Sequence, residues 1–325
     1  MNNRRDFLAG FSALSLSLDR VLGSARKTKK AQIAITFDLE MSRHYPRRGY
    51  TEWDYQKGNL DDATKKYSVA AAKLAKDRGV LIHFFLVGRV LEQDDISWLH
   101  EIHEMGHPIG NHTYDHVYLL ASTPTQTQFR FSRSPWLVEN KTVPEILREN
   151  IRLTEIAMKQ RAKISSTGFR TPGGFPKGLN DREDLQELLL DLGFTWISSK
   201  YPSHIATRTN QGVPQDTYDK IIQSQASAQP FRYKTGLVEI PMSPISDVNA
   251  FRSNFWRLEE FKKAVKLSLK SVISKRQVYD FLCHPSCMLI EDPGHDTLKT
   301  IIETVHAEPT IAEIVTLEQI YQHVT

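Results

Sequence analysis

The feature of this 325-residue chain that most constrains its fold is an alternation, from Ala31 onward, of short β-rich runs with helical patterns. Such alternation is typical of α/β proteins, in which helices connect the neighbouring strands of a parallel sheet. The first β-rich run ends at Asp38 and Glu40, and the last ends at His284. We therefore predict an α/β fold with a parallel sheet of about seven strands.

Seven runs carry the strand signal, and they predict strands at 33–37, 80–87, 108–111, 167–170, 194–198, 237–242 and 278–283. Helical patterns predict the longer helices at 61–78, 96–105, 144–162, 181–192 and 258–274. Gly79, Gly106 and Gly193 each follow a helical run, which is where helix-ending glycines occur. The segment 314–324 predicts a last short strand and helix.

Two connections, 117–143 and 200–236, are far longer than the loops that normally join such elements. Loops of that length in a compact domain usually shape binding sites or carry extra elements. The sequence shows no internal repeat, no low-complexity tract and no clear linker. We therefore predict one domain over 26–325 with two long loop insertions.

The composition, with 40% hydrophobic and 25% charged residues, allows a substantial buried core. The net charge of +4 is small, and Lys and Arg never gather into a long block, so a nucleic-acid partner is not expected. Cys283 and Cys287 are the only cysteines. Thiols four residues apart across a proline need not have disulfide geometry, and two cannot close a structural zinc site. We expect free, partly buried thiols.

The first 25 residues are typical of an export signal. Arg4 and Arg5 precede Phe-Leu, an apolar run follows from Phe7 to Leu18, and small residues come after it. The paired arginines resemble a twin-arginine signal, whose export machinery would be a transient partner. The run of about 12 residues is too short to span a bilayer, so a permanent membrane helix is not expected. We predict an exported protein, periplasmic or extracellular.

Six candidate chemical groups lie at or just after the carboxyl ends of predicted strands: Asp38, Glu40, His112, His116, Arg170 and His284. In a barrel of parallel strands these ends share one face, which carries the active site. Each group has a plain alternative, as a turn carboxylate, a surface cation or a structural histidine. The shared position at strand ends favours a common site.

His112 and His116 are four residues apart, one turn of helix, so both imidazoles can face one metal ion. His103 and His107 form a second pair with the same spacing. An isolated pair of this kind is more often made of exposed or core histidines without a metal. The first pair is distinguished by the other groups at strand ends.

Four ordered motifs resemble those of the polysaccharide deacetylase family, carbohydrate esterase family four. They are TFDLE at 36–40, GNHTYDH at 110–116, GFRTPGG at 168–174 and FLCHPS at 281–286. The resemblance implies a distorted barrel of alternating strands and helices with one divalent metal ion. Asp38-Leu39-Glu40, Ser198-Ser199 and the segment GLVEIP at 236–241 are closest to the branch with an Asp-x-Glu first motif.

The sequence departs from the family at three places. Most members have two adjacent aspartates in the first motif, so the division of roles between Asp38 and Glu40 stays open. Ile197 stands where an acidic residue often precedes Ser-Ser, and Gly173 where an aromatic often follows the motif-three proline. The last two changes concern the acyl pocket and hence the substrate.

The resemblance implies roles that amide hydrolysis needs. Glu40, His112 and His116 would hold the metal, most simply zinc, which can bring bound water to a pKa near 7. Asp38 would accept the proton of the water, with Arg170 keeping it ionised, and His284 would protonate the leaving nitrogen. A backbone N–H near Gly173 or Gly174 would help to stabilise the oxyanion.

The expected substrate is an N-acetylated or O-acetylated glycan. Aromatic residues of the loops would stack on sugar faces or pack the loops down: Tyr50, Trp53, Tyr55, Phe129, Phe131 and Trp136. Arg130 and Arg133 would suit an acidic glycan. The alternatives are hydrolysis of a small or cyclic amide, if the long loops close the cleft, and a non-catalytic carbohydrate-binding relic. The oligomeric state stays open.

The export signal gives a first testable prediction. Replacing Arg4 and Arg5 together by lysine should block export, because the paired arginines are what the twin-arginine interpretation depends on. Immunoblotting of cell fractions should then show a longer, unprocessed protein inside the cell, whereas Arg26→Lys should be exported normally. Normal processing of the double variant would refute the interpretation.

Overall fold

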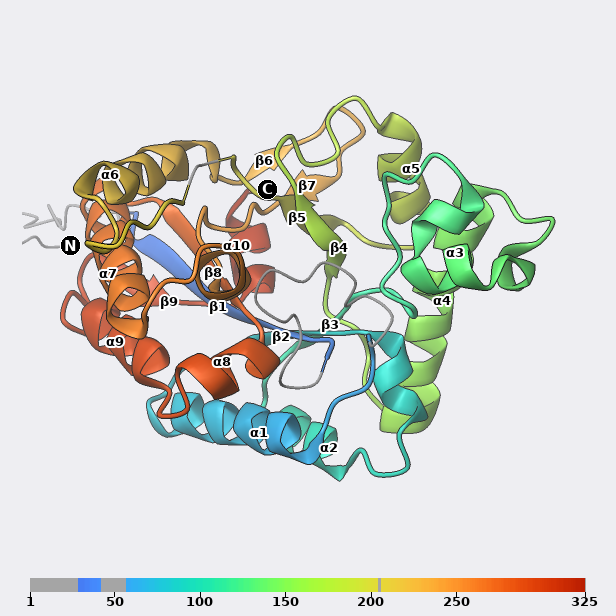
Figure 1. Ribbon diagram of the computed structural model, residues 1–325, viewed down its shortest axis with the longest axis horizontal. Helices are drawn as coiled ribbons and strands as arrows, with labels where there is room; N and C mark the ends of the chain where they lie inside the picture. The colour runs from blue at the N-terminus through green and yellow to red at the C-terminus, as the bar shows by residue number, and fades with distance from the viewer. Residues whose placement is uncertain (1–28, 42–56, 204–205, 325) are drawn as a thin grey trace, which may run out of the picture.

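The computed structural model describes residues 29–41, 57–203 and 206–324. In this part of the chain nine strands form one curled sheet, and most of the helices surround it (Figure 1). The strand order is β6-β7-β5-β4-β3-β2-β1-β8, and β9 also pairs with β1. The pairings are parallel except for β6 with β7. This is the predicted fold, a distorted parallel barrel, here curled rather than fully closed.

The strands are β1 (Ala31–Leu39), β2 (His83–Leu86), β3 (Ile109–Asn111), β4 (Phe169–Phe175), β5 (Trp196–Lys200), β6 (Phe231–Arg232), β7 (Val238–Glu239), β8 (Val278–Cys283) and β9 (Ala312–Ile314). The α-helices are α1 (Asp62–Asp77), α2 (Ser97–Glu104), α3 (Phe129–Arg133), α4 (Val143–Ala157), α5 (Glu183–Asp191), α6 (Gln215–Ser224), α7 (Leu258–Lys275), α8 (Pro285–Glu291), α9 (Asp296–His306) and α10 (Leu317–Val324). Short 3-10 or π turns, among them η5 (Met158–Ala162) and η7 (Val248–Ser253), lie between them.

The first strand shows how the sequence divides between the two faces of the sheet. Successive side chains of a strand point to opposite faces. In β1 one set of alternate residues, Ile33, Ile35, Phe37 and Leu39, joins the large outer core under the helices. The other set turns inward: Ala34 lies in the apolar interior, and Thr36 donates to Asp280 at 2.7 Å. Asp38 is the next inward residue. Along the inner face of β1 the side chains thus change from apolar at Ala34 to polar at Thr36 and Asp38.

The core has three parts. One outer layer packs β1, β2 and β8 against α1, α2, α7 and α9, and a second packs β4 and β5 against α4 and α5. The third part fills the barrel interior, where Phe85 and Trp196 meet Leu317 and Ile320 of α10. Trp196 also donates its indole N–H to Glu318 at 2.6 Å. The last helix therefore closes the amino-terminal end of the barrel.

The gap between β7 and β8 is bridged rather than paired as strands. The Ser243 backbone N–H donates to the Asp280 carbonyl at 3.0 Å, and the Asp280 N–H donates to Ser243 Oγ, also at 3.0 Å. The serine side chain stands in for the backbone acceptor that a regular strand would offer. These two bonds satisfy the edge of β8 and keep the sheet curled.

The structure confirms the predicted longer helices and most strands to within a few residues. It shortens the strand predicted at 237–242 to β7 and adds β6, α6, α8 and α9. Six of the eleven residues of α9 are β-branched, which weakens the local helix signal, yet Leu298, Ile301 and Val305 bury one face of it. Both long connections carry extra elements, since α3 lies in 117–143 and α6 and β6 lie in 200–236.

Two groups of predictions lie outside the described residues: the export signal at 1–25, and the aromatic residues Tyr50, Trp53 and Tyr55. Among the described helices none has the length and apolar character needed to cross a membrane. Cys283 and Cys287 are both free, as expected, and both are buried.

Gly168 gives a stability prediction. It has a left-handed backbone, with φ +76°, and a Cβ there would lie 2.0 Å from the Trp196 ring that fills the barrel floor. Gly168→Ala should therefore destabilise the protein by about 3 kcal/mol or more, combining backbone strain with a steric clash. Gly193→Ala is the matched control, because φ there is +92° but nothing lies within 4 Å of the added Cβ. Its cost should be about 1 kcal/mol. Urea unfolding midpoints would test both, and equal losses would contradict the packing argument.

Candidate active site

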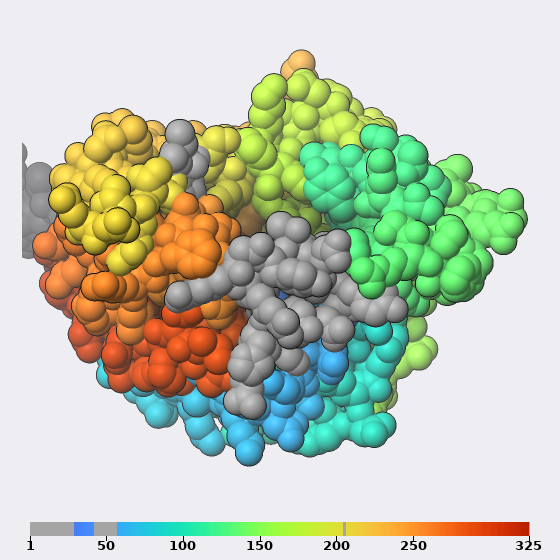
Figure 2. Space-filling view, viewed as in Figure 1, coloured from blue at the N-terminus to red at the C-terminus, as the bar shows by residue number. Residues whose placement is uncertain are grey.

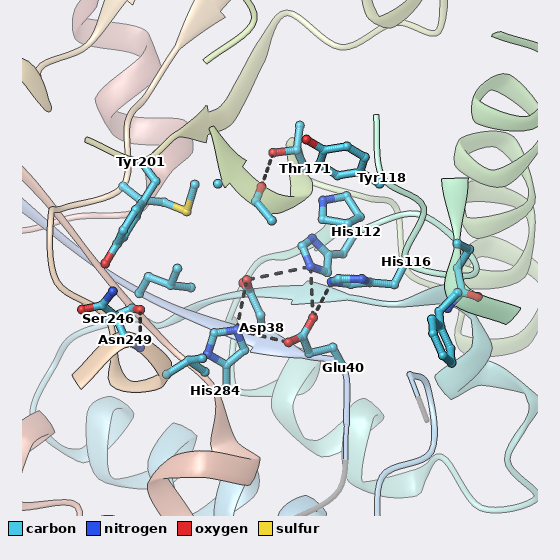
Figure 3. Close-up of a pocket in the computed structure, with 18 of the residues that line it drawn as sticks. Asp38, Glu40, His112, His116, Tyr118, Thr171, Tyr201, Ser246, Asn249 and His284 are labelled. Atoms are coloured by element: carbon cyan, nitrogen blue, oxygen red, sulfur yellow. Dashed lines mark hydrogen bonds and ion pairs between the residues drawn. The ribbon is translucent and has the colours of Figure 1, made fainter. Parts of the chain in front are cut away.

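A cavity of about 400 Å³ opens at the carboxyl ends of the barrel strands. Five of the six predicted site residues line it: Asp38, Glu40, His112, His116 and His284. The sixth, Arg170, is fully buried below them and bonds to Asp38. The side chains converge from three separate parts of the sequence (Figure 3). The six residues predicted at strand ends therefore do lie close together.

His112 and His116 lie on an irregular loop after β3, so the single turn of helix expected from their spacing was wrong. Thr113 and His116 both have left-handed backbones, with φ 60° and 59°. Local side chains hold the loop: Asn111 Oδ1 accepts from the Thr113 N–H at 2.8 Å, and Thr113 Oγ1 accepts from the Val117 N–H at 2.9 Å. Such bonds compete with helix formation. The loop still brings the two imidazole centres to 5.0 Å.

Glu40, His112 and His116 form the one group in the described part of the chain that could hold a metal ion, with one atom from each within 4.8 Å of the others. Glu40 Oε2 is 2.7 Å from His116 Nε2 and 3.4 Å from His112 Nε2. His112 Nδ1 lies 2.9 Å from the Arg170 carbonyl, which can only accept, so Nδ1 carries the proton and Nε2 is left as a ligand atom. Burial also lowers the pKa of His112, which keeps the ring neutral.

Glu40 is ionised despite its burial. Burial alone would raise its pKa, but Lys57, His116 and His284 hold the pKa of Glu40 well below its usual value. Lys57 Nζ lies 2.6 Å from Glu40 Oε1, and the lysine side chain is itself fully buried. No sequence pattern pointed to Lys57, because it follows a long stretch of sequence without a regular pattern.

Arg170 joins two carboxylates beneath the cavity. Its Nη1 donates to Asp38 Oδ1 at 3.0 Å, as predicted, and its Nη2 donates to Asp280 Oδ2 at 2.5 Å. Burial raises the pKa of Asp280 to about 6, although Arg170 opposes that rise. Asp280 was missed, but it precedes His284 by four residues on an extended segment, so period-two spacing could have placed both on the inner face. Ile197 packs in the outer core, so no carboxylate reaches Arg170 from that position.

His284 is held by a carboxylate that sequence reasoning missed. Asp247 Oδ1 lies 2.9 Å from His284 Nδ1, and Asp247 Oδ2 accepts from the His284 backbone N–H at 2.7 Å. Burial alone would lower the pKa of His284, but Asp247 and Glu40 raise it to about 10. The ring is therefore an imidazolium at neutral pH. Its Nε2 faces Glu40 Oε1 at 3.2 Å and Asp38 Oδ2 at 3.9 Å, on the side away from His112 (Figure 3).

The motif-three glycines lie on the cavity wall. Gly173 has a left-handed backbone, φ +76°, which an aromatic residue would adopt only with strain, and Thr171 Oγ1 donates to its carbonyl at 2.9 Å (Figure 3). A Cβ on Gly174 would lie 2.4 Å from Cβ of Tyr201, which also lines the cavity. Gly173, where the family often has an aromatic residue, thus adopts a backbone conformation that favours glycine, and the next residue, Gly174, packs closely on Tyr201.

The long connection 117–143 projects at one side of the molecule (Figure 2, green) and supplies part of the cavity wall. Phe129 lines the cavity, whereas Phe131 is buried and Trp136 is 68% exposed elsewhere. Arg130 pairs with Asp115 at 2.7 Å, and the Arg133 guanidinium stacks on Phe129. Neither arginine lines the cavity, so the proposed contact with an acidic glycan gains no support.

The second histidine pair has no part in the site. His107 is buried, and its ring nitrogens bond to the Ile82 N–H and the Ala72 carbonyl, both at 3.0 Å. His103 is exposed on α2. Both therefore follow the plain interpretation of a histidine without a metal.

Residues 59–195 match the family model of the polysaccharide deacetylases, a stretch that contains the second and third motifs. No curated protein shows significant sequence similarity to the chain. The fold is similar to that of a protein from Mycobacterium smegmatis described as a polysaccharide deacetylase, with TM-score 0.59, 16% identity, and coverage of 91% of this chain and 90% of that one.

Two further structures share the fold. A protein from Pseudomonas aeruginosa PAO1, also described as a polysaccharide deacetylase, has TM-score 0.57 and 14% identity, with 90% of each chain covered. The Puue allantoinase has TM-score 0.54 and 12% identity, with 91% of each chain covered. Identities this low establish the fold alone. Over residues 59–195 the chain is therefore similar to the polysaccharide deacetylase family, and its fold is one that members of that family share.

Proposed function

We propose that the protein is a hydrolase that removes N-acetyl or O-acetyl groups from a glycan with the help of one divalent metal ion. The observation that carries the proposal is the meeting, in one cavity, of a candidate metal triad with Asp38 and a charged His284. The Asp-x-Glu branch of the family remains the subfamily to which we assign it, on the first motif and on Ser198-Ser199.

The donor set fits a catalytic metal site. Two imidazole nitrogens and one carboxylate oxygen are the ligands that zinc takes in catalytic centres, with positions left open for water and substrate. Glu40, His112 and His116 would hold the ion, which would polarise the acyl carbonyl and activate a water molecule. We propose zinc because imidazole-rich sites of this kind suit it.

The remaining residues divide the proton transfers between them. Asp38 Oδ1 is occupied by Arg170, so Asp38 Oδ2, on the cavity side, would take the proton from the attacking water. His284 carries a proton that Asp247 stabilises, and its Nε2 would deliver that proton to the leaving nitrogen. Nδ1 is held by Asp247, so only Nε2 is placed to give up a proton to the substrate. The two residues have opposite charges and hence opposite roles.

A small or cyclic amide is the second candidate substrate. Residues of the connection 117–143, Tyr118 and 126–129, wall one side of the cavity, and Tyr201 at the start of the second connection walls another. This partial enclosure suits a small ligand as well as the end of a glycan. A non-catalytic carbohydrate-binding relic is less well supported, because the charged Arg170 and His284 are still held in working positions.

We also propose that the protein is exported, on the evidence of the amino-terminal sequence alone. An acetylated glycan of the cell envelope would then be within its reach.

The metal site gives the next prediction. The wild-type protein should bind about one divalent ion per chain, and His112→Ala or His116→Ala should lose it, because two remaining ligands hold zinc weakly. His103→Ala is the matched control, since that histidine is exposed and is not one of the three residues of the triad. Metal analysis after dialysis measures the content. Equal metal content in all three variants would show that His112 and His116 are not metal ligands.

The division between base and acid gives a prediction on turnover. Acetate should be released from a panel of N-acetylated oligomers by the metal-loaded wild type. Asp38→Asn and His284→Ala should keep the metal and lose about 10² to 10⁴ in kcat, the usual contribution of a positioned proton-transfer group. If Asp38→Asn releases the ion while Glu40→Gln keeps it, Asp38 is the ligand and the division is reversed.

Ester substrates separate the acid from a structural histidine. An aryl acetate leaves as a phenolate that needs little protonation, so His284→Ala should impair its hydrolysis much less than that of an N-acetyl substrate. Equal losses on ester and amide would show that His284 is not the acid. Including small and cyclic amides in the panel decides between the two substrate classes.

A further inference from the structure

Lys57 is a buried lysine that the proposed chemistry does not use. Its side chain is 0% exposed, and its Nζ lies 2.6 Å from Glu40 Oε1. Lysines are almost never fully buried unless they are paired, because an ammonium group removed from water loses much hydration. The ion pair with Glu40 therefore helps to keep Lys57 inside the protein, next to the candidate metal ligands.

The backbone holds Lys57 in this place. The N–H of Gly58 donates to the carbonyl of Glu40 at 2.7 Å, so the chain before α1 is fastened to the end of β1. Gly58 has φ +85°, and a Cβ there would lie 2.3 Å from Cβ of Arg89. Only glycine fits this close approach. Gly58 thus allows the backbone approach that places the adjacent Lys57 next to Glu40.

The two oxygens of Glu40 face different groups. Oε2 faces the ligand histidines, at 2.7 Å from His116 Nε2 and 3.4 Å from His112 Nε2. Oε1 faces two cations, at 2.6 Å from Lys57 Nζ and 3.2 Å from His284 Nε2. A carboxylate whose second oxygen is taken by an ammonium group has only one oxygen left for an ion.

We propose that Lys57 is a positioning residue that restricts Glu40 to one-oxygen coordination and weakens the affinity of the site for a divalent ion. The inference rests on the proposed metal site. A fixed positive charge beside a ligand oxygen repels a dication. The same charge compensates the buried Glu40 carboxylate when no ion is bound, so it stabilises the metal-free protein. Whatever stabilises the metal-free state relative to the loaded state lowers metal affinity.

The restriction also has a use in catalysis. If Glu40 held the ion through Oε2 alone, positions for water and the substrate carbonyl would stay open. With both oxygens bound, one of these positions would be filled. Lys57 would therefore lower the affinity of the site for the metal ion while keeping coordination positions open for water and substrate.

The test is metal binding to Lys57→Met, which removes the charge while keeping an unbranched side chain of similar length. Zinc and cobalt affinities would be measured by chelator competition on metal-free protein. We expect the dissociation constant of the variant to fall by about tenfold or more. The metal-free variant should also melt at a lower temperature than the metal-free wild type, and added zinc should recover much of that difference. Lys57→Gln, also neutral, should behave in the same way.

Lys65→Met is the matched control, because Lys65 pairs with Asp62 of the same helix and does not line the cavity, so its loss should leave metal affinity unchanged. The cobalt absorption spectrum supplies a second readout. It should change in Lys57→Met, as the released Glu40 Oε1 joins the ion, and should stay the same in Lys65→Met.

The outcomes separate this inference from the proposed function. If the wild type binds metal and Lys57→Met binds it equally or more weakly, Lys57 does not oppose binding and the inference is overturned, while the metal site stands. If the wild type binds no metal, the metal site falls and the inference falls with it. A Lys57 variant that folds only with zinc supports the inference, whereas one that stays unfolded with zinc present assigns Lys57 to the fold and overturns it.

Discussion

The site depends on one buried cation, Arg170. Its guanidinium group is fully enclosed, and such a charge is tolerated only when it is paired and hydrogen-bonded. Asp38 and Asp280 supply opposite charges, Thr36 and Ser198 supply hydroxyl oxygens, and the group lies 4.4 Å above the centre of the Phe85 ring. The backbone carbonyl of the same residue fixes the tautomer of His112. Arg170 thus sets the proposed base through its side chain and a proposed metal ligand through its main chain.

Around this cation the site is a balance of charges rather than a set of independent groups. Asp38, Glu40, Asp247 and Asp280 face Arg170, Lys57 and His284. Each anion has a cation within bonding distance, which is what allows so many ionisable groups to be buried together. The placement also separates their chemistry. The carboxylate of Asp247 keeps the proton on His284, whereas Arg170 leaves one oxygen of Asp38 toward the cavity.

The barrel explains why these groups meet. Its floor is apolar and closed by α10, the middle layer holds Arg170 and Asp280, and the chemical groups stand at the top. The inward positions of β1 pass through all three layers, from Ala34 through Thr36 to Asp38. A strand can do this because every second residue faces inward while the intervening residues anchor it in the outer core. The rigid core thereby fixes the spacing of the reactive side chains.

Sequence patterns were enough to predict the fold class and to select six residues that lie together in the candidate site. Periodicity and helix-ending glycines marked the strands and helices, and strand ends marked six residues that do lie together. It also distinguished His112 from His103 and His107, because only the former had companions at strand ends. These successes concern local patterns and the one geometric rule that parallel strands end on the same face.

Only the tertiary structure revealed the partners of those residues. Asp247, 37 residues before His284, and Lys57, 17 residues after Glu40, carry no local signal, because their significance lies in contacts made through the folded chain. The loop of His112 and His116 is irregular rather than helical, since Asn111 and Thr113 bond to its backbone. Likewise α9 forms despite its β-branched residues because its apolar face is buried. The local sequence determines which ionisable side chains lie at the strand ends. Long-range packing determines the partners of each side chain, and through them its charge and orientation.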